Sequence, residues 1–154
     1  LMAAAFPEAP ILNLQRDARA IGWSIYKKRF SSDGLGFAFG AADIVAYYNG
    51  YRDMIAHWDK VLPGRVTNFD YDALTEDQEG QSRRLLELCG LDWDERVLNF
   101  HETERAVVTA SVLQVRQKMY KGSSEAWRPF APYLPELFAA LPGEDAPIEV
   151  SKDA

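Results

Sequence analysis

The chain has 154 residues, of which 47% are hydrophobic and 26% charged, a balance typical of one soluble globular domain. Its formal charge of -6 argues against nucleic acid or an anionic membrane as its main partner, so any anion site must be local. No apolar run approaches the roughly 18 residues of a membrane-spanning helix, and the single cysteine, Cys89, cannot form an internal disulfide. We therefore expect a cytoplasmic protein in a reducing compartment.

Two short segments are predicted to be strands, the first from an apolar run and the second from Val66 and Phe69, which flank polar positions. The first covers residues 11–15 and precedes Asp17, which can cap a helix expected over 18–30. The second covers residues 65–70. Between them, apolar side chains at three- and four-residue steps predict a long helix over 43–62. Because helices fill the connection of about fifty residues, we expect the two strands to be parallel.

Helices also dominate the second half of the chain. Thr75 and Gln78 have the spacing of a capping box, which predicts that a helix begins there, and Gly90 marks its expected end. Further helices are expected over 95–100 and 133–141.

Two strands are too few for a stable parallel sheet, so we expect the remaining strands to lie upstream of Leu1. The predicted fold class is α/β: part of a parallel sheet flanked by helices, rich in helix, with its N-terminal strands missing. The acidic, proline-containing stretch 142–154 is expected to be a flexible tail, which leaves 1–141 as the folded part. On its own, the chain should then be unstable or inactive.

The segment 14–26 resembles the part of sulfotransferases that binds 3′-phosphoadenosine-5′-phosphosulfate (PAPS). In that family, an arginine at a strand end and a serine eight residues later bind the 3′-phosphate, and Arg16 and Ser24 match this spacing. A guanidinium at the strand end can donate bidentate hydrogen bonds to phosphate oxygens, while a hydroxyl two helical turns further along supplies another donor. In the tyrosylprotein and related bacterial branches a further basic residue assists, and Lys28 stands at that place.

The stretch 69–74 is similar to the family's Tyr-Glu-x-Leu motif, whose tyrosine lies near the adenine, and the resemblance gives that role to Tyr71. The stretches 85–93 and 99–117 resemble the bacterial branch that is often fused to tetratricopeptide repeats. Within the second stretch, Ser111 is a candidate donor to the nucleotide.

Residues 120–127 can be aligned with the family's Arg-Lys-Gly-x-x-Gly-Asp-Trp loop, which closes over the 3′-phosphate. Lys121, Gly122 and Trp127 agree with that loop, although Trp127 could equally be a core residue. A basic group surrounds the loop, and from it we select Lys121 and then Arg116 as nucleotide contacts; its members are Arg116, Lys118, Lys121 and Arg128.

The resemblance covers about residues 5–141 and implies an enzyme of P-loop fold, a PAPS-dependent sulfotransferase. This enzyme would transfer a sulfuryl group from PAPS to an acceptor hydroxyl or amine. The chain would supply the 3′-phosphate and adenosine side of the site. The family's phosphosulfate-binding loop and its base would lie in the N-terminal half of the domain, so we assign no catalytic residue here.

Two alternatives from other classes remain open. One is a non-catalytic helical interaction module, in which the aromatic side chains of the helix over 43–62 contact a partner; these are Tyr47, Tyr48, Tyr51 and Trp58. The other is a nucleotide kinase that shares the P-loop architecture. The two histidines, His57 and His101, have no partner at metal-ligand spacing, so no metal site is predicted.

Overall fold

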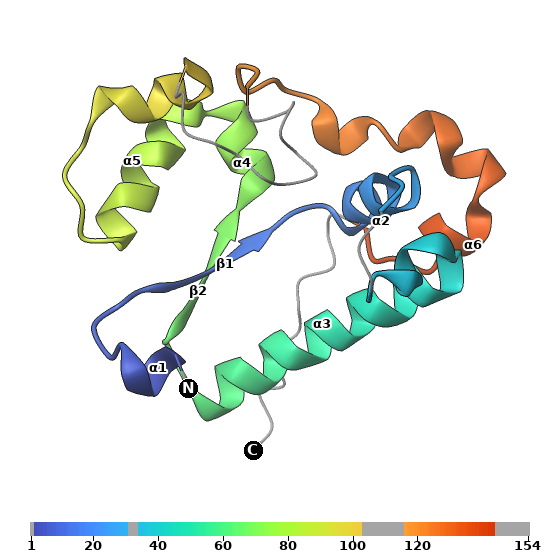
Figure 1. The fold of residues 1–154 in the computed structure, drawn as a ribbon, viewed down its shortest axis with the longest axis horizontal. Helices are drawn as coiled ribbons and strands as arrows, with labels where there is room; N and C mark the ends of the chain where they lie inside the picture. The colour runs from blue at the N-terminus through green and yellow to red at the C-terminus, as the bar shows by residue number, and fades with distance from the viewer. Residues whose placement is uncertain (1, 31–33, 103–115, 144–154) are drawn as a thin grey trace.

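The computed structural model describes residues 2–30, 34–102 and 116–143 (Figure 1). In chain order, its first elements are α1 (Met2–Ala5), β1 (Ile11–Gln15), α2 (Ala18–Tyr26), η1 (Gly36–Phe39), α3 (Ala41–Val61) and β2 (Val66–Asp70). They are followed by α4 (Tyr71–Glu76), α5 (Gln78–Leu88), η2 (Glu95–Glu102), η3 (Ser123–Glu125), η4 (Arg128–Tyr133) and α6 (Pro135–Phe138), where η denotes a 3₁₀ helix.

The two strands pair in parallel, as the sequence predicts. Ile11 lies opposite Val66, and the register continues to Gln15 opposite Asp70, so both strands end at the same edge. Within the described residues these two strands make up the whole sheet. The carboxyl ends of the strands lead into α2 and α4, which brings the starts of these two helices to one side of the molecule (Figure 1).

Asp17 caps α2, as predicted, because its side chain accepts a hydrogen bond of 2.6 Å from the backbone N–H of Ala20. The helix ends at Tyr26 and not near residue 30. Lys27, Lys28 and Arg29 add no apolar side chain to the helix, so further turns would gain no burial to stabilise them.

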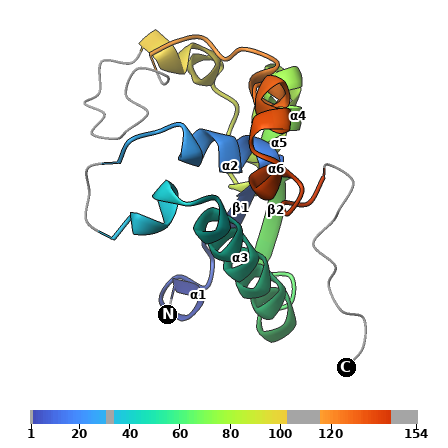
Figure 2. The ribbon, with the colours of Figure 1, turned by 90° about the vertical axis from the view of Figure 1, so that its right-hand side faces the viewer.

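The main core lies where α2, α3 and α6 pack together, away from the sheet (Figures 1 and 2). Gly22 of α2 permits this approach, since a Cβ added there would lie 2.5 Å from Cδ1 of Leu141. Trp127 belongs to this core, with its ring centre 5.2 Å from that of Phe138. The buried members of the core are Ala18, Ala20, Ile44, Trp127, Leu137, Phe138 and Leu141.

The capping box predicted at Thr75 and Gln78 is wrong. β2 runs directly into α4, so Thr75 lies inside that helix and its hydroxyl donates to the carbonyl of Asp72 at 2.8 Å. The cap of α5 is Asp77, whose carboxylate accepts from the backbone N–H of Gly80 at 3.0 Å. The predicted end of α5 is confirmed, because Gly90 has the positive φ of 66° that favours glycine after a helix.

The helix predicted over 133–141 is present only in part. A 3₁₀ helix precedes it, and the α-helical turn begins at Pro135, a residue suited to a first helical position, and ends at Phe138. Ser111 and residues 144–154 of the expected tail lie outside the described residues. Among the helices of the described ranges, none has both the length and the apolar character that a membrane crossing requires.

Candidate functional site

The ends of the two strands place Arg16 beside Tyr71. Gln15 and Asp70 are the last paired residues of the sheet, so the residues that follow them emerge at the same edge. The guanidinium carbon of Arg16 lies 5.3 Å from the centre of the Tyr71 ring, which is within the range of a cation–π contact. Parallel pairing therefore brings together two residues that are far apart in the sequence.

The loop around η3 lies directly on Arg16. Nε of Arg16 donates to the hydroxyl of Ser124 at 3.1 Å, and Nη2 donates to the hydroxyl of Ser123 at 3.0 Å. Gly122 precedes this short helix with a φ of 81°, a conformation that glycine adopts without strain. Residues 120–127, which align with the family's phosphate-closing loop, thus contact Arg16, the residue predicted to bind the 3′-phosphate.

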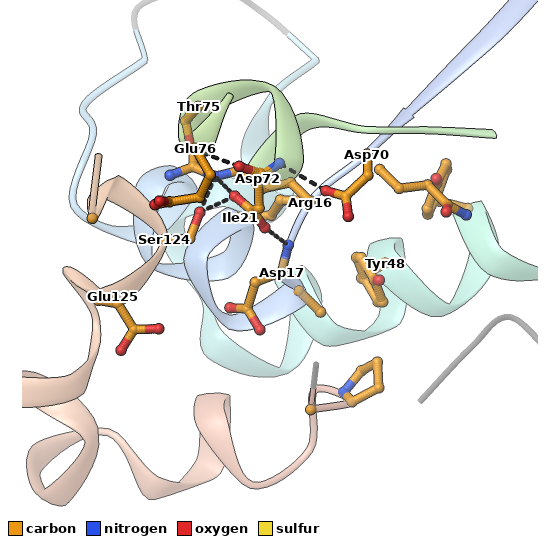
Figure 3. Close-up of a pocket in the computed structure, with 16 residues that line it drawn as sticks. Arg16, Asp17, Ile21, Tyr48, Asp70, Asp72, Thr75, Glu76, Ser124 and Glu125 are labelled. Atoms are coloured by element: carbon orange, nitrogen blue, oxygen red, sulfur yellow. Dashed lines mark hydrogen bonds and ion pairs between the residues drawn. The ribbon is translucent and has the colours of Figure 1, made fainter. Parts of the chain in front are cut away.

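Asp72 connects this loop to the end of β1 (Figure 3). One carboxylate oxygen, Oδ2, accepts from the backbone N–H of Asp17 at 3.0 Å. The other, Oδ1, accepts from the hydroxyl of Ser124 and lies 3.8 Å from Nε of Arg16. Sequence reasoning missed Asp72, Ser123 and Ser124, and for Asp72 the acidic position of the Tyr-Glu-x-Leu motif was an available signal.

One cavity at this edge, here called the basic cavity, has a volume of about 470 Å³. It brings together Arg16, Ser24 and Tyr71, with Ser123 from the η3 loop. No carboxylate of the described residues lines it. Its remaining lining residues are Ala20, Phe100, Gln117, Lys118, Met119 and Tyr120. The volume and the mixture of cationic, hydroxyl and aromatic groups are those of a small-molecule site that accepts an anion.

A second cavity of about 450 Å³, here called the acidic cavity, shares only Arg16 with the first among the described residues (Figure 3). Its carboxylates are Asp17, Asp70, Asp72, Glu76 and Glu125. Tyr48 and Tyr51 of α3 also line it, and burial raises the pKa of the Tyr48 phenol above its ordinary value of 10.0. Because like charges repel, a phosphate is favoured in the basic cavity and disfavoured in the acidic one.

Three other predicted contacts lie outside both cavities. Lys121 forms an exposed ion pair with Glu76, in which Nζ is 3.1 Å from Oε2. Lys28 lies just beyond the end of α2, and Arg116 is exposed ahead of the η3 loop. The structure therefore unites Arg16, Ser24 and Tyr71, but not these three lysine and arginine side chains.

The aromatic side chains of α3 differ in their contacts and in their exposure. The hydroxyl of Tyr51 donates to Oδ1 of Asn13 in β1 at 3.0 Å, and Tyr48 lines the acidic cavity. Tyr47, in contrast, is 60% exposed and Trp58 is 38% exposed. Of the four residues considered for a partner surface, Tyr47 and Trp58 are therefore exposed, whereas Tyr48 and Tyr51 are half-buried.

Comparison with known proteins identifies the family of the chain. A family model described as "Sulfotransferase family" matches residues 1–95, which is more than half of the chain. The chain belongs to the sulfotransferase family. The sulfotransferase match includes β1, α2, α3, β2 and α4, and therefore Arg16, Ser24 and Tyr71. It ends before Ser123 and Ser124, so the family match does not cover the loop on Arg16.

A relative shows similarity over a longer stretch. An uncharacterized protein of Aquifex aeolicus (strain VF5) is 38% identical over 143 residues, which cover 92% of this chain and 19% of the relative. The chain thus spans about a fifth of the length of that curated relative.

Proposed function

We propose that this chain provides the 3′-phosphate and adenosine side of a PAPS-dependent sulfotransferase site. The enzyme would transfer a sulfuryl group to an acceptor hydroxyl or amine. The observation that supports this most strongly is the meeting of Arg16, Ser24 and Tyr71 in the basic cavity. Membership of the sulfotransferase family and the order of these motifs along the chain support the same function.

The residues of the basic cavity fit the chemistry of the nucleotide. Arg16 uses Nε and Nη2 for the two serine hydroxyls, and Nη1 makes no hydrogen bond to a described residue, so this part of the guanidinium can still donate to a phosphate. Ser24 adds a hydroxyl, and Tyr71 and Phe100 add aromatic rings suited to a purine. When bound, PAPS supplies the sulfuryl group together with the bisphosphate on which it is carried.

In this proposal the residues of the chain bind and orient the nucleotide and do not transfer protons. Arg16 neutralises and orients the 3′-phosphate, Ser24 donates a hydrogen bond to it, and Tyr71 contacts the adenine. The acidic cavity next to Arg16 repels the phosphate, which favours a single orientation. Lys28, Arg116 and Lys121 complete the proposed set of contacts from outside the cavity, and Lys121 would exchange Glu76 for the nucleotide. Ser111, which lies outside the described residues, is proposed as a further donor on the resemblance alone.

The test is calorimetric titration of the full-length protein with adenosine 3′,5′-bisphosphate and, separately, with adenosine 5′-phosphate. The two nucleotides differ only in the 3′-phosphate, so we expect the bisphosphate to bind at least about tenfold more tightly. Lys27→Ala is the control variant. It removes an exposed cation of the same region that lines neither cavity, so its affinities for the two nucleotides should equal those of the wild type. Equal affinities for the two nucleotides would refute the proposed role of Arg16 and Ser24.

A further inference from the structure

The side chain of Asp72 is held at several points although it belongs to no predicted binding set. We propose that Asp72 is a positioning residue, which fixes the Arg16 guanidinium and holds the η3 loop on it through the hydroxyl of Ser124. The effect on nucleotide binding rests on the proposed function, whereas the effect on the loop does not.

The backbone around Asp72 is fixed first. Asp70 caps α4, and its carboxylate accepts from the backbone N–H groups of Asp72 at 2.8 Å and Ala73 at 3.1 Å. Asp72 therefore stands in a capped first turn, and its Oδ2 accepts the backbone N–H of Asp17. These contacts join the start of α4 to the end of β1, where Arg16 is located.

The hydroxyl of Ser124 connects the side chains of Asp72 and Arg16 by hydrogen bonds. The hydroxyl has one proton, which it donates to Oδ1 of Asp72, so its lone pairs are left to accept from Nε of Arg16. Ser123 differs, because it accepts from Nη2 of Arg16 and lines the basic cavity, whereas Ser124 lines the acidic cavity. The two adjacent serines thus have different neighbours, and only Ser124 bonds to Asp72.

The carboxylate has two effects on a bound phosphate, and they have opposite signs. Its charge lies 3.8 Å from Nε of Arg16 and reduces the attraction of that side chain for an anion. Its hydrogen bonds hold the guanidinium in one orientation, which reduces the entropy lost when a phosphate binds. The proposal requires the second effect to exceed the first.

Hydrogen exchange of the full-length protein without nucleotide tests the contact with the loop. The backbone N–H of Glu125 donates to the carbonyl of Gly122 at 3.2 Å and reports on the loop. In Ser124→Ala and in Asp72→Asn, we expect this amide to exchange roughly 2- to 10-fold faster, the factor that corresponds to one net hydrogen bond. Ser124→Thr retains the hydroxyl and should exchange like the wild type. Unchanged exchange in both Ser124→Ala and Asp72→Asn would overturn the proposal.

Two controls separate this effect from misfolding. In Ser124→Ala, the amides of β1 should exchange at wild-type rates, because the pairing of β1 with β2 and the contact between Asp72 and the backbone of Asp17 do not involve the Ser124 hydroxyl. Ser24→Ala removes a hydroxyl from the basic cavity outside the η3 loop, so it should leave the Glu125 amide unchanged. If Asp72→Asn fails to fold, Ser124→Ala, which leaves the backbone contact with Asp17 intact, still decides the outcome.

Calorimetry with adenosine 3′,5′-bisphosphate and adenosine 5′-phosphate tests the effect on binding. We expect Ser124→Ala and Asp72→Asn each to weaken the bisphosphate by roughly 2- to 10-fold with little change for the monophosphate. The double variant should lose no more than the single ones, because both remove the same connection. Tighter bisphosphate binding by Asp72→Asn would overturn the proposal, since it would show that the charge effect is larger. Equal wild-type affinities would refute the proposed function, and hydrogen exchange would then decide the role of Asp72.

Discussion

Replacement of Arg16 by alanine should separate its role in binding from its role in folding. The substitution removes a guanidinium that contacts two serine hydroxyls and lies 5.3 Å from the Tyr71 ring. A charge-assisted hydrogen bond to a phosphate contributes about 1.5 to 3 kcal/mol, which corresponds to a loss of roughly 10- to 150-fold in bisphosphate affinity. The lost internal contacts should lower the free energy of unfolding by about 1 to 3 kcal/mol.

The assay compares the two adenosine nucleotides for the wild type, Arg16→Ala and Arg16→Lys, with urea unfolding of each protein alongside. Arg16→Lys keeps the charge but loses the planar set of guanidinium N–H donors. Its bisphosphate affinity should therefore lie between those of the wild type and Arg16→Ala. The monophosphate affinity should change little in either variant, because this ligand has no 3′-phosphate. An equal loss for both nucleotides would show that Arg16 maintains the fold and does not recognise the 3′-phosphate.

Three further predictions concern stability and charge. Asp70→Ala should lower the free energy of unfolding in urea by about 0.5 to 2 kcal/mol, since it removes the cap of α4, and an unchanged value would contradict that role. Gly22→Ala should lower the thermal midpoint, because the contact of 2.5 Å with Leu141 costs about 1 to 3 kcal/mol and the helix gains only about 1 kcal/mol; a higher midpoint would show that the core yields. Hydrogen bonds from Arg96 lower the pKa of Asp94 from 3.8 to about 2. In an NMR titration of Arg96→Ala, the pKa of Asp94 should return toward 3.8. In the wild type, the stabilisation that comes from the lowered pKa of Asp94 should be lost as the pH falls from about 3.8 to about 2.

Local patterns in the sequence were sufficient to predict the strands and their parallel pairing. Residues 11–15 form a short apolar run, and in the predicted strand 65–70 Val66 and Phe69 flank polar positions. A long amphipathic helix separates the two segments, and this order restricts how they can pair. The spacing of Arg16 and Ser24 predicted their common position, because one helix connects them and its geometry is fixed. Tyr71 lies beside Arg16 because the sheet register pairs Gln15 with Asp70, the residues that precede them.

Contacts that depend on tertiary packing were not predictable in this way. Ser123 and Ser124 bond to Arg16 across more than a hundred residues of sequence, and no local pattern encodes such a pair. The position of Lys121 in the sequence predicted a phosphate contact, but its side chain meets the nearby carboxylate of Glu76 in the structure. The capping box failed for a related reason, since β2 runs directly into α4 and Thr75 is already helical when α5 begins.

The most direct test is a crystal structure of the full-length protein with adenosine 3′,5′-bisphosphate. We predict that the nucleotide occupies the basic cavity, with its 3′-phosphate within hydrogen-bonding distance of Arg16 and Ser24 and its adenine against Tyr71. A nucleotide bound in the acidic cavity, or a 3′-phosphate that does not contact Arg16, would contradict the proposed site.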